Sequence, residues 1–526
     1  MEDLNNLAKA TMKSSLFLFV GLSASTILLA INSIIIARLL GPENYGLYTV
    51  IMIVPTLFIA LSDFGISPTL TKFIASNRVE GKNDETFTLI RTGFMIKILL
   101  IAVISTILWI TSDYLAIYFL SRPEIGPMIR LSVIYLIGQA STDSLNATFI
   151  GQDEAGKSGV VMIINAASRF VISPFLILMG LGVSGAVLGM GIGSVLASIV
   201  GVVLLLLILH SKIQHDMKKG SSPMNPLKMF VIFGSPLYMS AILLSFQNEL
   251  RRIFLAFFTT DEKIGNFSTA INFSSLMNVL TTPVASSLFP AFSKIDIDKD
   301  KKSLEKMFKI SIKYMSLVIV PVIFYILFLS KDLIELFYGS QYKIAAYYLS
   351  LYILTFFLAP IGMYVIEAFL NSQEKTMTTL KMKIINFITF VPLSLIFIPL
   401  YEPPGLIISI FISQFISLIY GLINIYKNYH LNIDWNISFK ILISSALSIL
   451  PVFILQYILP LNNIIIKMIV SVSIFSISLL ICLPLTGTLN KDDIINIKNL
   501  SDNLPFIRTI INTLLKIEIK ILNINI

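Results

Sequence analysis

The chain has 526 residues, of which 56% are hydrophobic and 13% are charged, and its mean hydropathy is +0.85. Soluble domains carry roughly 25% charged residues, so this composition excludes a soluble globular protein and indicates a polytopic membrane protein. A net charge of +9 would favour nucleic-acid binding in a soluble chain. Here we attribute it to lysine in short loops on one side of a bilayer, and we expect no nucleic-acid partner.

Cysteine and histidine give no sign of a metal or redox site. Cys482 is the only cysteine, and His210, His215 and His430 all fall between the long apolar runs. A single thiol forms neither a disulfide framework nor a thiolate cluster. We therefore expect no metal and no cofactor.

Long apolar runs divide the chain into spanning segments. A helix needs about 20 apolar residues to cross the hydrocarbon core, and backbone groups in lipid must pair within their own segment, which favours helices. The N-terminal sequence is acidic at first and lacks a cleavage pattern, so the first run is expected to remain as a helix. The sequence predicts an all-α polytopic fold with about fourteen transmembrane helices, near 14–38, 46–67, 89–111, 127–150, 158–180, 183–209, 229–257, 264–289, 306–330, 344–371, 377–399, 404–426, 439–459 and 463–485.

Lysine and arginine are distributed unevenly among the loops between these segments. If the N-terminus is cytoplasmic, the inner loops and adjoining helix starts hold more than twice as many basic residues as the outer ones. Basic residues accumulate on the cytoplasmic side of a membrane. We therefore predict a multi-pass protein of the cell (plasma or inner) membrane with both termini in the cytoplasm.

The chain contains a weak internal repeat. The stretch ARLLGPENYGLY, which joins the first two segments, resembles FLAFFTTDEKIGNF, and in that register Gly46 faces Gly265 at an offset of 219. A second block repeats at an offset of 221, where Asn165 faces Asn386. An even number of helices in each copy gives two copies of the same orientation. The repeat predicts a six-helix lobe at 1–210, a second six-helix lobe at 211–430, an additional transmembrane helix pair at 431–485 and a tail at 486–526.

The tail has apolar residues at near-helical spacing with basic residues between them. This pattern favours a cytoplasmic amphipathic helix on the inner leaflet. A partly ordered tail is an equal alternative.

Ionisable residues within spanning segments mark a pathway or a site, because they are costly in lipid. The seventh segment contains the sequence SFQNELRRIFLAFF, with Glu249, Arg251 and Arg252 in its outer half. Neighbouring residues on a helix differ by about 100°, so the two arginines cannot face the same way. We expect one to line a lumen that holds an anion, and the other to pair with Glu249 or to reach the outer headgroups. The alternative is that neither contacts an anion, because one pairs with Glu249 and the other extends to the headgroups.

Other polar residues fall within both predicted lobes. Asn165 and Arg169 are four residues apart and share a helix face, so Arg169 either lines a polar cavity or pairs with Asp143. The remaining cavity-lining candidates are Lys97 in the first lobe and Lys383 and Asn386 in the second, where Lys383 could also extend to the inner headgroups.

Asp63 follows the second segment, in the sequence LSDFGISPTL. A carboxylate at this place accepts hydrogen bonds from free backbone N–H groups at the start of a helix. We interpret Asp63 as a cap or hinge.

Catalytic motifs are absent from the sequence. It has no GxxxxGK[ST], no HExxH and no GxSxG, and no soluble domain to house such a site. We expect no enzyme. The first segment, FVGLSASTILLAINSI, also lacks an acidic residue, which weakens any function that needs a proton- or sodium-binding carboxylate there.

The opening block, with ARLLGPENYGLY and LSDFGISPTLTKFIA, resembles the start of the polysaccharide-biosynthesis flippases. These are the oligosaccharide-lipid translocases (Wzx-like) of the multidrug/oligosaccharidyl-lipid/polysaccharide exporter superfamily. The block ELRRIFLAFFTTDEKIGNFSTA is similar to the start of that family's second half. The resemblance covers essentially the whole chain.

The resemblance implies a flippase that moves a glycan on a polyprenyl (pyro)phosphate from the cytoplasmic to the outer leaflet by alternating access. Its partners would be the polyprenyl-linked oligosaccharide, membrane lipid and glycan-assembly proteins. Arginine suits the phosphate groups of such a lipid because its planar fork donates two hydrogen bonds. Two alternatives remain, a drug or small-solute antiporter of the same superfamily and a membrane-embedded glycan polymerase.

Overall fold

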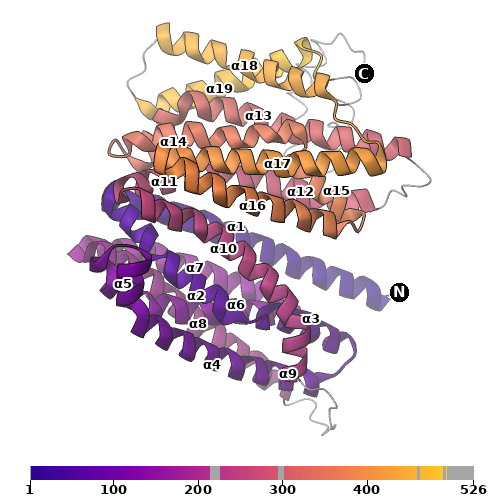
Figure 1. Cartoon of the computed structure of the whole chain (residues 1–526). Helices are drawn as coiled ribbons and strands as arrows, with labels where there is room; N and C mark the ends of the chain where they lie inside the picture. Colours follow the sequence, from indigo (N-terminus) through magenta and orange to yellow (C-terminus); the bar gives the residue numbers. More distant parts are fainter. Residues whose placement is uncertain (1, 214–225, 294–300, 459–462, 490–492, 494–526) are drawn as a thin grey trace. The chain divides into compact units, whose positions relative to one another are not determined.

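The computed structural model describes residues 2–213, 226–293, 301–458, 463–489 and 493. All regular secondary structure in these residues is helical. They form two compact units, Met1–Ser268 and Thr269–Ile526, which Figure 1 draws in its indigo-to-magenta and magenta-to-yellow colours. Each unit is described by itself below.

The first unit contains the helices up to the beginning of α11. Short 3-10 or π-helical turns connect or extend several of these helices. The helices are α1 (Glu2–Ile51), α2 (Ile53–Asp63), α3 (Ile66–Val79), α4 (Asn83–Tyr114), η1 (Leu115–Phe119), η2 (Pro123–Ile125), α5 (Gly126–Leu131), α6 (Val133–Gly151), α7 (Ala155–Leu176), η3 (Ile177–Leu181), α8 (Gly182–Ile213), α9 (Pro226–Met229), η4 (Phe230–Gly234), α10 (Ser235–Phe258) and α11 (Asp261–Ser274).

The second unit begins within α11 and contains the remaining helices, several of which run alongside one another in Figure 1. They are α12 (Leu276–Ser293), α13 (Lys301–Tyr338), α14 (Lys343–Ile353), η5 (Leu354–Ile361), α15 (Met363–Ser372), α16 (Thr376–Tyr401), α17 (Pro403–Tyr429), α18 (Trp435–Ile458) and α19 (Ile464–Leu485).

A hydrophobic core in the first unit joins α3, α4, α6, α7 and α8. On α3, Ile66, Leu70 and Ile74 are fully buried, because a spacing of four residues returns to the same helix face. On α6, Leu145 and Phe149 enter the same core. This packing fixes the orientation of α6, so its other faces are free to present polar side chains elsewhere.

The two repeat turns predicted from the sequence contact each other within the first unit. The helix α1 is interrupted at Gly41, after which its last part carries Gly46. A Cβ atom on Gly46 would lie 1.7 Å from the carbonyl oxygen of Asp261, and one on Gly265 would lie 1.8 Å from that of Pro42. Glycine is therefore required at both positions, because the two backbones lie too close for any side chain.

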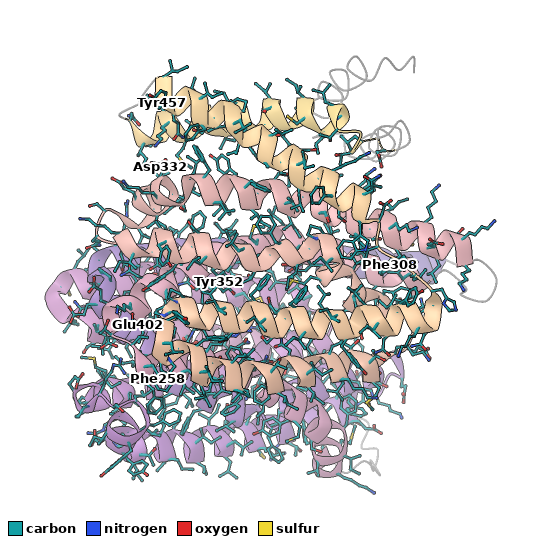
Figure 2. All side chains as sticks on the ribbon, turned by 45° about the horizontal axis from the view of Figure 1, so that its top comes forward. Phe258, Phe308, Asp332, Tyr352, Glu402 and Tyr457 are labelled. Atoms are coloured by element: carbon teal, nitrogen blue, oxygen red, sulfur yellow. The ribbon has the colours of Figure 1, made fainter. Side chains whose placement is uncertain are left out.

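Polar contacts attach the last helices to the rest of the second unit. Lys467 on α19 pairs with Asp332 on α13 at 2.7 Å, and Asp332 is labelled in Figure 2. Beyond α19, Asp493 pairs with Lys313 on α13, and both side chains are buried. An ion pair thus joins α19 to α13, and a second one joins the residue beyond α19 to the same helix.

The predicted all-α, polytopic membrane fold is confirmed. Nine continuous stretches of the described residues are long and apolar enough to cross a membrane. Two of them, Val20–Arg78 and Ala155–His210, each contain more than one α-helix. Helices occupy all the predicted segments, whereas the count of fourteen spans and the lobe boundaries remain predictions. The predicted tail helix lies outside the described residues apart from its first few positions and Asp493.

Candidate functional site

Three polar residues line one face of α6. Tyr135, Gln139 and Asp143 follow each other at intervals of four, so they lie one helical turn apart. Asn165 and Arg169 have the same spacing on α7, which packs against α6 and α8. The sequence periodicity thus brings two short polar stripes to one place within an otherwise apolar bundle.

The side chain of Gln139 links these two stripes. Its Nε2 donates to Asp143 Oδ1 at 2.7 Å. Its Oε1 accepts from Asn165 Nδ2 at 3.3 Å and from Arg169 Nη2. Asp143 and Arg169 are therefore connected through a neutral amide rather than by a direct ion pair.

Arg169 is 5% exposed and is held mostly by uncharged groups. Its Nη2 donates to Ser194 Oγ on α8 at 2.8 Å, and its guanidinium lies 5.1 Å from the ring centroid of Tyr135. Its Nε has no hydrogen-bond partner among the described residues. A buried donor of this kind carries an energetic cost, which a ligand acceptor would remove.

Asp63 and Lys97 form a second pair of charged residues in the first unit. Lys97 is 2% exposed, and its Nζ donates to Asp63 Oδ1 at 3.2 Å and to the carbonyl oxygen of Ser62 at 3.1 Å. The same Asp63 oxygen accepts from the backbone N–H of Ser67 in the first turn of α3 at 3.4 Å. This contact agrees with the interpretation of Asp63 as a cap, although Gly65 occupies the N-cap position itself. Asp143 lies within electrostatic reach of both Asp63 and Lys97.

The helix α10 carries the arginine pair that the sequence singled out. Glu249 is 5% exposed, and its carboxylate lies 3.6 Å from Arg252 Nη1. Arg252 is nevertheless about half exposed, with a side-chain exposure of 47%. Both Arg252 and Arg169 lie within electrostatic reach of Tyr48 and Tyr135. Arg169 is in ring contact with Tyr135, and Arg251 is half-buried on α10.

The candidates in the second unit do not gather into a comparable cluster. Lys383 pairs with Glu367 at 2.5 Å, and both side chains are substantially exposed. Asn386 Nδ2 lies 3.5 Å from Ser413 Oγ on α17. These two residues have separate partners, so the cluster of the first unit is the stronger candidate site.

Three members of this cluster, Tyr135, Gln139 and Ser194, were not predicted from the sequence, because the prediction was based mainly on charged residues within the spanning segments. A search for any polar residue four positions from Asp143 would have found Gln139. Ser194 had no such signal, because it comes from α8 and meets Arg169 only through tertiary packing.

Comparison with known proteins agrees with this membrane-embedded architecture. The sequence matches the family described as polysaccharide biosynthesis protein over residues 35–347, which is more than half of the chain. The chain belongs to this family. Residues 273–480 also match the lipid II flippase MurJ family. This member of the polysaccharide biosynthesis family is a membrane transport protein and not an enzyme.

One curated relative of this family member is the probable low-salt glycan biosynthesis flippase Agl15 of Haloferax volcanii. The two sequences are 27% identical over 95 residues, which make up 18% of this chain and 20% of Agl15. The match therefore spans about a fifth of the relative's length.

Two solved structures share the fold. The lipid II flippase MurJ in an inward closed conformation is 17% identical and has a TM-score of 0.66, covering 89% of this chain and 99% of MurJ. An inward-facing multidrug resistance MATE family transporter of the MOP superfamily is also 17% identical and has a TM-score of 0.64, covering 78% of this chain and 98% of that transporter. At this identity the likeness establishes the MOP-superfamily fold.

Proposed function

We propose that the protein is a flippase for a lipid-linked glycan. It would move a polyprenyl-(pyro)phosphate-linked oligosaccharide from the cytoplasmic to the outer leaflet by alternating access, for assembly of a surface polysaccharide or glycoprotein. The family match supports this function, as do the flippase names of Agl15 and MurJ. The energy for transport would come from an ion gradient, the membrane potential or consumption of the product.

The main support for this proposal is the set of contacts that the buried side chain of Arg169 makes. Most of its described contacts are to uncharged groups, and its Nε remains available for an acceptor. A guanidinium is planar and offers paired N–H donors that match the oxygens of phosphate. Arg252 interacts electrostatically with Tyr48 and Tyr135, and we assign it as a second cation for the same phosphate.

The remaining cluster residues would keep the arginines in place. Gln139 spaces Arg169 from Asp143, which prevents neutralisation of the guanidinium by direct pairing. Glu249 orients Arg252 while leaving it about half exposed. The other predicted cavity residues stay candidates within their own units. They are Lys97, Asp143, Asn165 and Arg251 in the first unit, and Lys383 and Asn386 in the second.

We also propose the membrane topology that the sequence predicts. It has fourteen spans, lobes at 1–210 and 211–430, a helix pair at 431–485 and cytoplasmic termini. Helices at these positions in the described residues are consistent with the proposed segments, and the proposed orientation is based on the uneven distribution of basic residues among the loops. An isoprenoid tail would stay in lipid while the headgroup crosses through the polar interior.

Transbilayer movement in proteoliposomes tests the function. The purified protein is offered a polyprenyl-linked oligosaccharide, and a lectin or glycosidase outside the vesicles reports which glycans have crossed. We expect wild-type protein to accelerate crossing, and Arg169→Ala to slow it by about tenfold or more, because one hydrogen bond to a charged group contributes roughly 1.5–3 kcal/mol. Arg169→Lys should also slow it, since an ammonium lacks the planar fork.

Two further variants separate the site from general effects. Gln139→Leu should slow crossing because Arg169 can then collapse onto Asp143, whereas Arg78→Ala should not, since Arg78 is an exposed residue paired with Asp153. A cationic dye serves as the control solute. Movement of the dye without movement of the glycolipid would refute the flippase and favour an antiporter. Crossing that is insensitive to the substitutions of Arg169 and Gln139 would retain the function and reject the site.

A further inference from the structure

The second unit contains a cavity of about 160 Å³ at a break in a helix. The helix α14 ends at Ile353, continues as the 3-10 segment η5, and resumes as α15 after Gly362. Gly362 has a φ of 91°, a left-handed conformation that glycine adopts without strain. Interrupted helices inside transporters mark substrate sites, because unwound backbone is tolerated in a membrane only where it is covered by protein or lines a cavity.

The residues that line this cavity, which we call the α14–α15 cavity, are uncharged. They include hydroxyl groups from α11 and η5, the rings of Tyr352 and Phe356, and the amide of Gln414 on α17. Figure 2 labels Tyr352 at the end of α14, where the helix breaks. A phosphate would find no cation among these lining side chains, so the cavity suits a neutral ligand.

The hydrogen bonds of the lining groups define the ligand further. Ser274 and Ser275 donate their hydroxyl protons to backbone carbonyls at 2.7 and 2.6 Å, and Thr355 does so at 2.7 Å. Their oxygen lone pairs remain available as acceptors. Gln414 Oε1 is buried and accepts no hydrogen bond among the described residues. The cavity thus presents acceptors to a ligand that is rich in O–H or N–H donors.

Aromatic rings and the cavity volume favour a sugar ring as the ligand. Tyr352 and Phe356 lie one turn apart, with ring centroids 6.1 Å from each other, and offer apolar faces to the C–H side of a pyranose. The cavity volume of about 160 Å³ is many times the roughly 10–15 Å³ that one water molecule needs on the same measure. A hydroxyl-rich ring fits this description.

We propose that the α14–α15 cavity binds one uncharged sugar residue of the transported glycan, with Gln414 accepting a hydrogen bond from a sugar hydroxyl or amide. This inference rests on the proposed flippase function and extends it. The α14–α15 cavity would select the glycan by rejecting charged sugars.

Binding of synthetic carriers to the purified full-length protein tests this inference. Three probes are compared by calorimetry: short-chain polyprenyl pyrophosphate alone, the same lipid carrying N-acetylglucosamine, and the same lipid carrying glucuronic acid. We expect N-acetylglucosamine to tighten binding relative to the bare lipid, and glucuronic acid not to do so. Gln414→Leu and Thr355→Val should each reduce this gain, by about tenfold for Gln414→Leu, without changing the affinity for the bare lipid.

Thr389→Val provides the matched control. Thr389 on α16 also donates its hydroxyl proton to a backbone carbonyl, at 2.7 Å, but it is not among the lining residues. The sugar subsite would be overturned if the gain in affinity from N-acetylglucosamine persisted in both cavity variants, or if glucuronic acid gave an equal gain. Flipping in proteoliposomes would continue in either case, so the proposed function would stand. Absence of both carrier binding and flipping in the wild type would instead overturn the proposed function, and the subsite with it.

Discussion

The contact between Gly46 and Gly265 gives a sharp prediction for stability. Alanine at position 46 would place its Cβ 1.7 Å from the carbonyl oxygen of Asp261, whereas ordinary van der Waals contact needs at least 3.4 Å. The two backbones must therefore separate by about 1.7 Å, the difference between these distances. Overpacking of this kind costs about 1–3 kcal/mol or more. We expect the cost to exceed the roughly 1 kcal/mol by which alanine favours a helix.

Thermal unfolding in detergent, followed by the loss of the monodisperse peak in gel filtration, measures this cost. Gly46→Ala should lower the midpoint by roughly 5 °C, given about 2–4 °C per kcal/mol. The matched control is Gly156→Ala on α7, where the new Cβ would lie an ordinary 3.6 Å from Phe17. An unchanged midpoint for Gly46→Ala would refute the close approach of the two turns.

The double substitution provides an independent check. Gly46→Ala and Gly265→Ala push apart the same two backbones, so the second change adds little once the first has separated them. We therefore expect the double variant to be destabilised by clearly less than the sum of the single variants. Strict additivity would show that the two glycines act at separate contacts.

Two buried ion pairs give the remaining predictions. Lys97→Met leaves Asp63 partly buried without its cation and should destabilise the protein by about 2–3 kcal/mol. This value is towards the low end for a broken buried pair, because the side chain of Asp63 is 28% exposed. Adding Asp63→Asn should restore most of the loss in the thermal midpoint, and no recovery would contradict the pairing. Lys313→Met should cost about 3–5 kcal/mol because both Lys313 and Asp493 are buried. Lys309→Met, one turn earlier on α13, removes an exposed pair and should cost less than about 1 kcal/mol; equal midpoints for these two variants would refute the difference in burial.

The sequence predicts local features of this fold better than tertiary partners. Apolar runs long enough for a membrane locate the helices because backbone pairing in lipid leaves no other regular choice. The spacing of four between Asn165 and Arg169 correctly predicts a shared face. The pairing of Lys97 with Asp63 could not be predicted in this way, because α2 and α4 meet only through the fold.

The repeat shows what sequence comparison can predict and what it cannot. Alignment pairs Gly46 with Gly265, and the structure brings these same residues into contact. Pro42 and Asp261, which the glycines approach, are also 219 positions apart. Equivalent residues meet in this way when two similar segments face each other across a two-fold axis. Alignment identifies equivalent residues but contains no information that they touch.

The ion pair of Lys97 and Asp63 also bears on how the protein is made. Lys97 lies near the middle of α4, and an unpaired lysine at the centre of a helix entering a membrane costs about 2.5–3.5 kcal/mol. Asp63 precedes it in the chain, so its carboxylate is already at the membrane when α4 leaves the ribosome. The order of synthesis thus supplies the counter-ion before the charge that needs it. Mapping of glycosylation sites placed on either side of α4 would detect failed insertion in Asp63→Asn, and complete insertion of that variant would show that Lys97 enters the bilayer unaided.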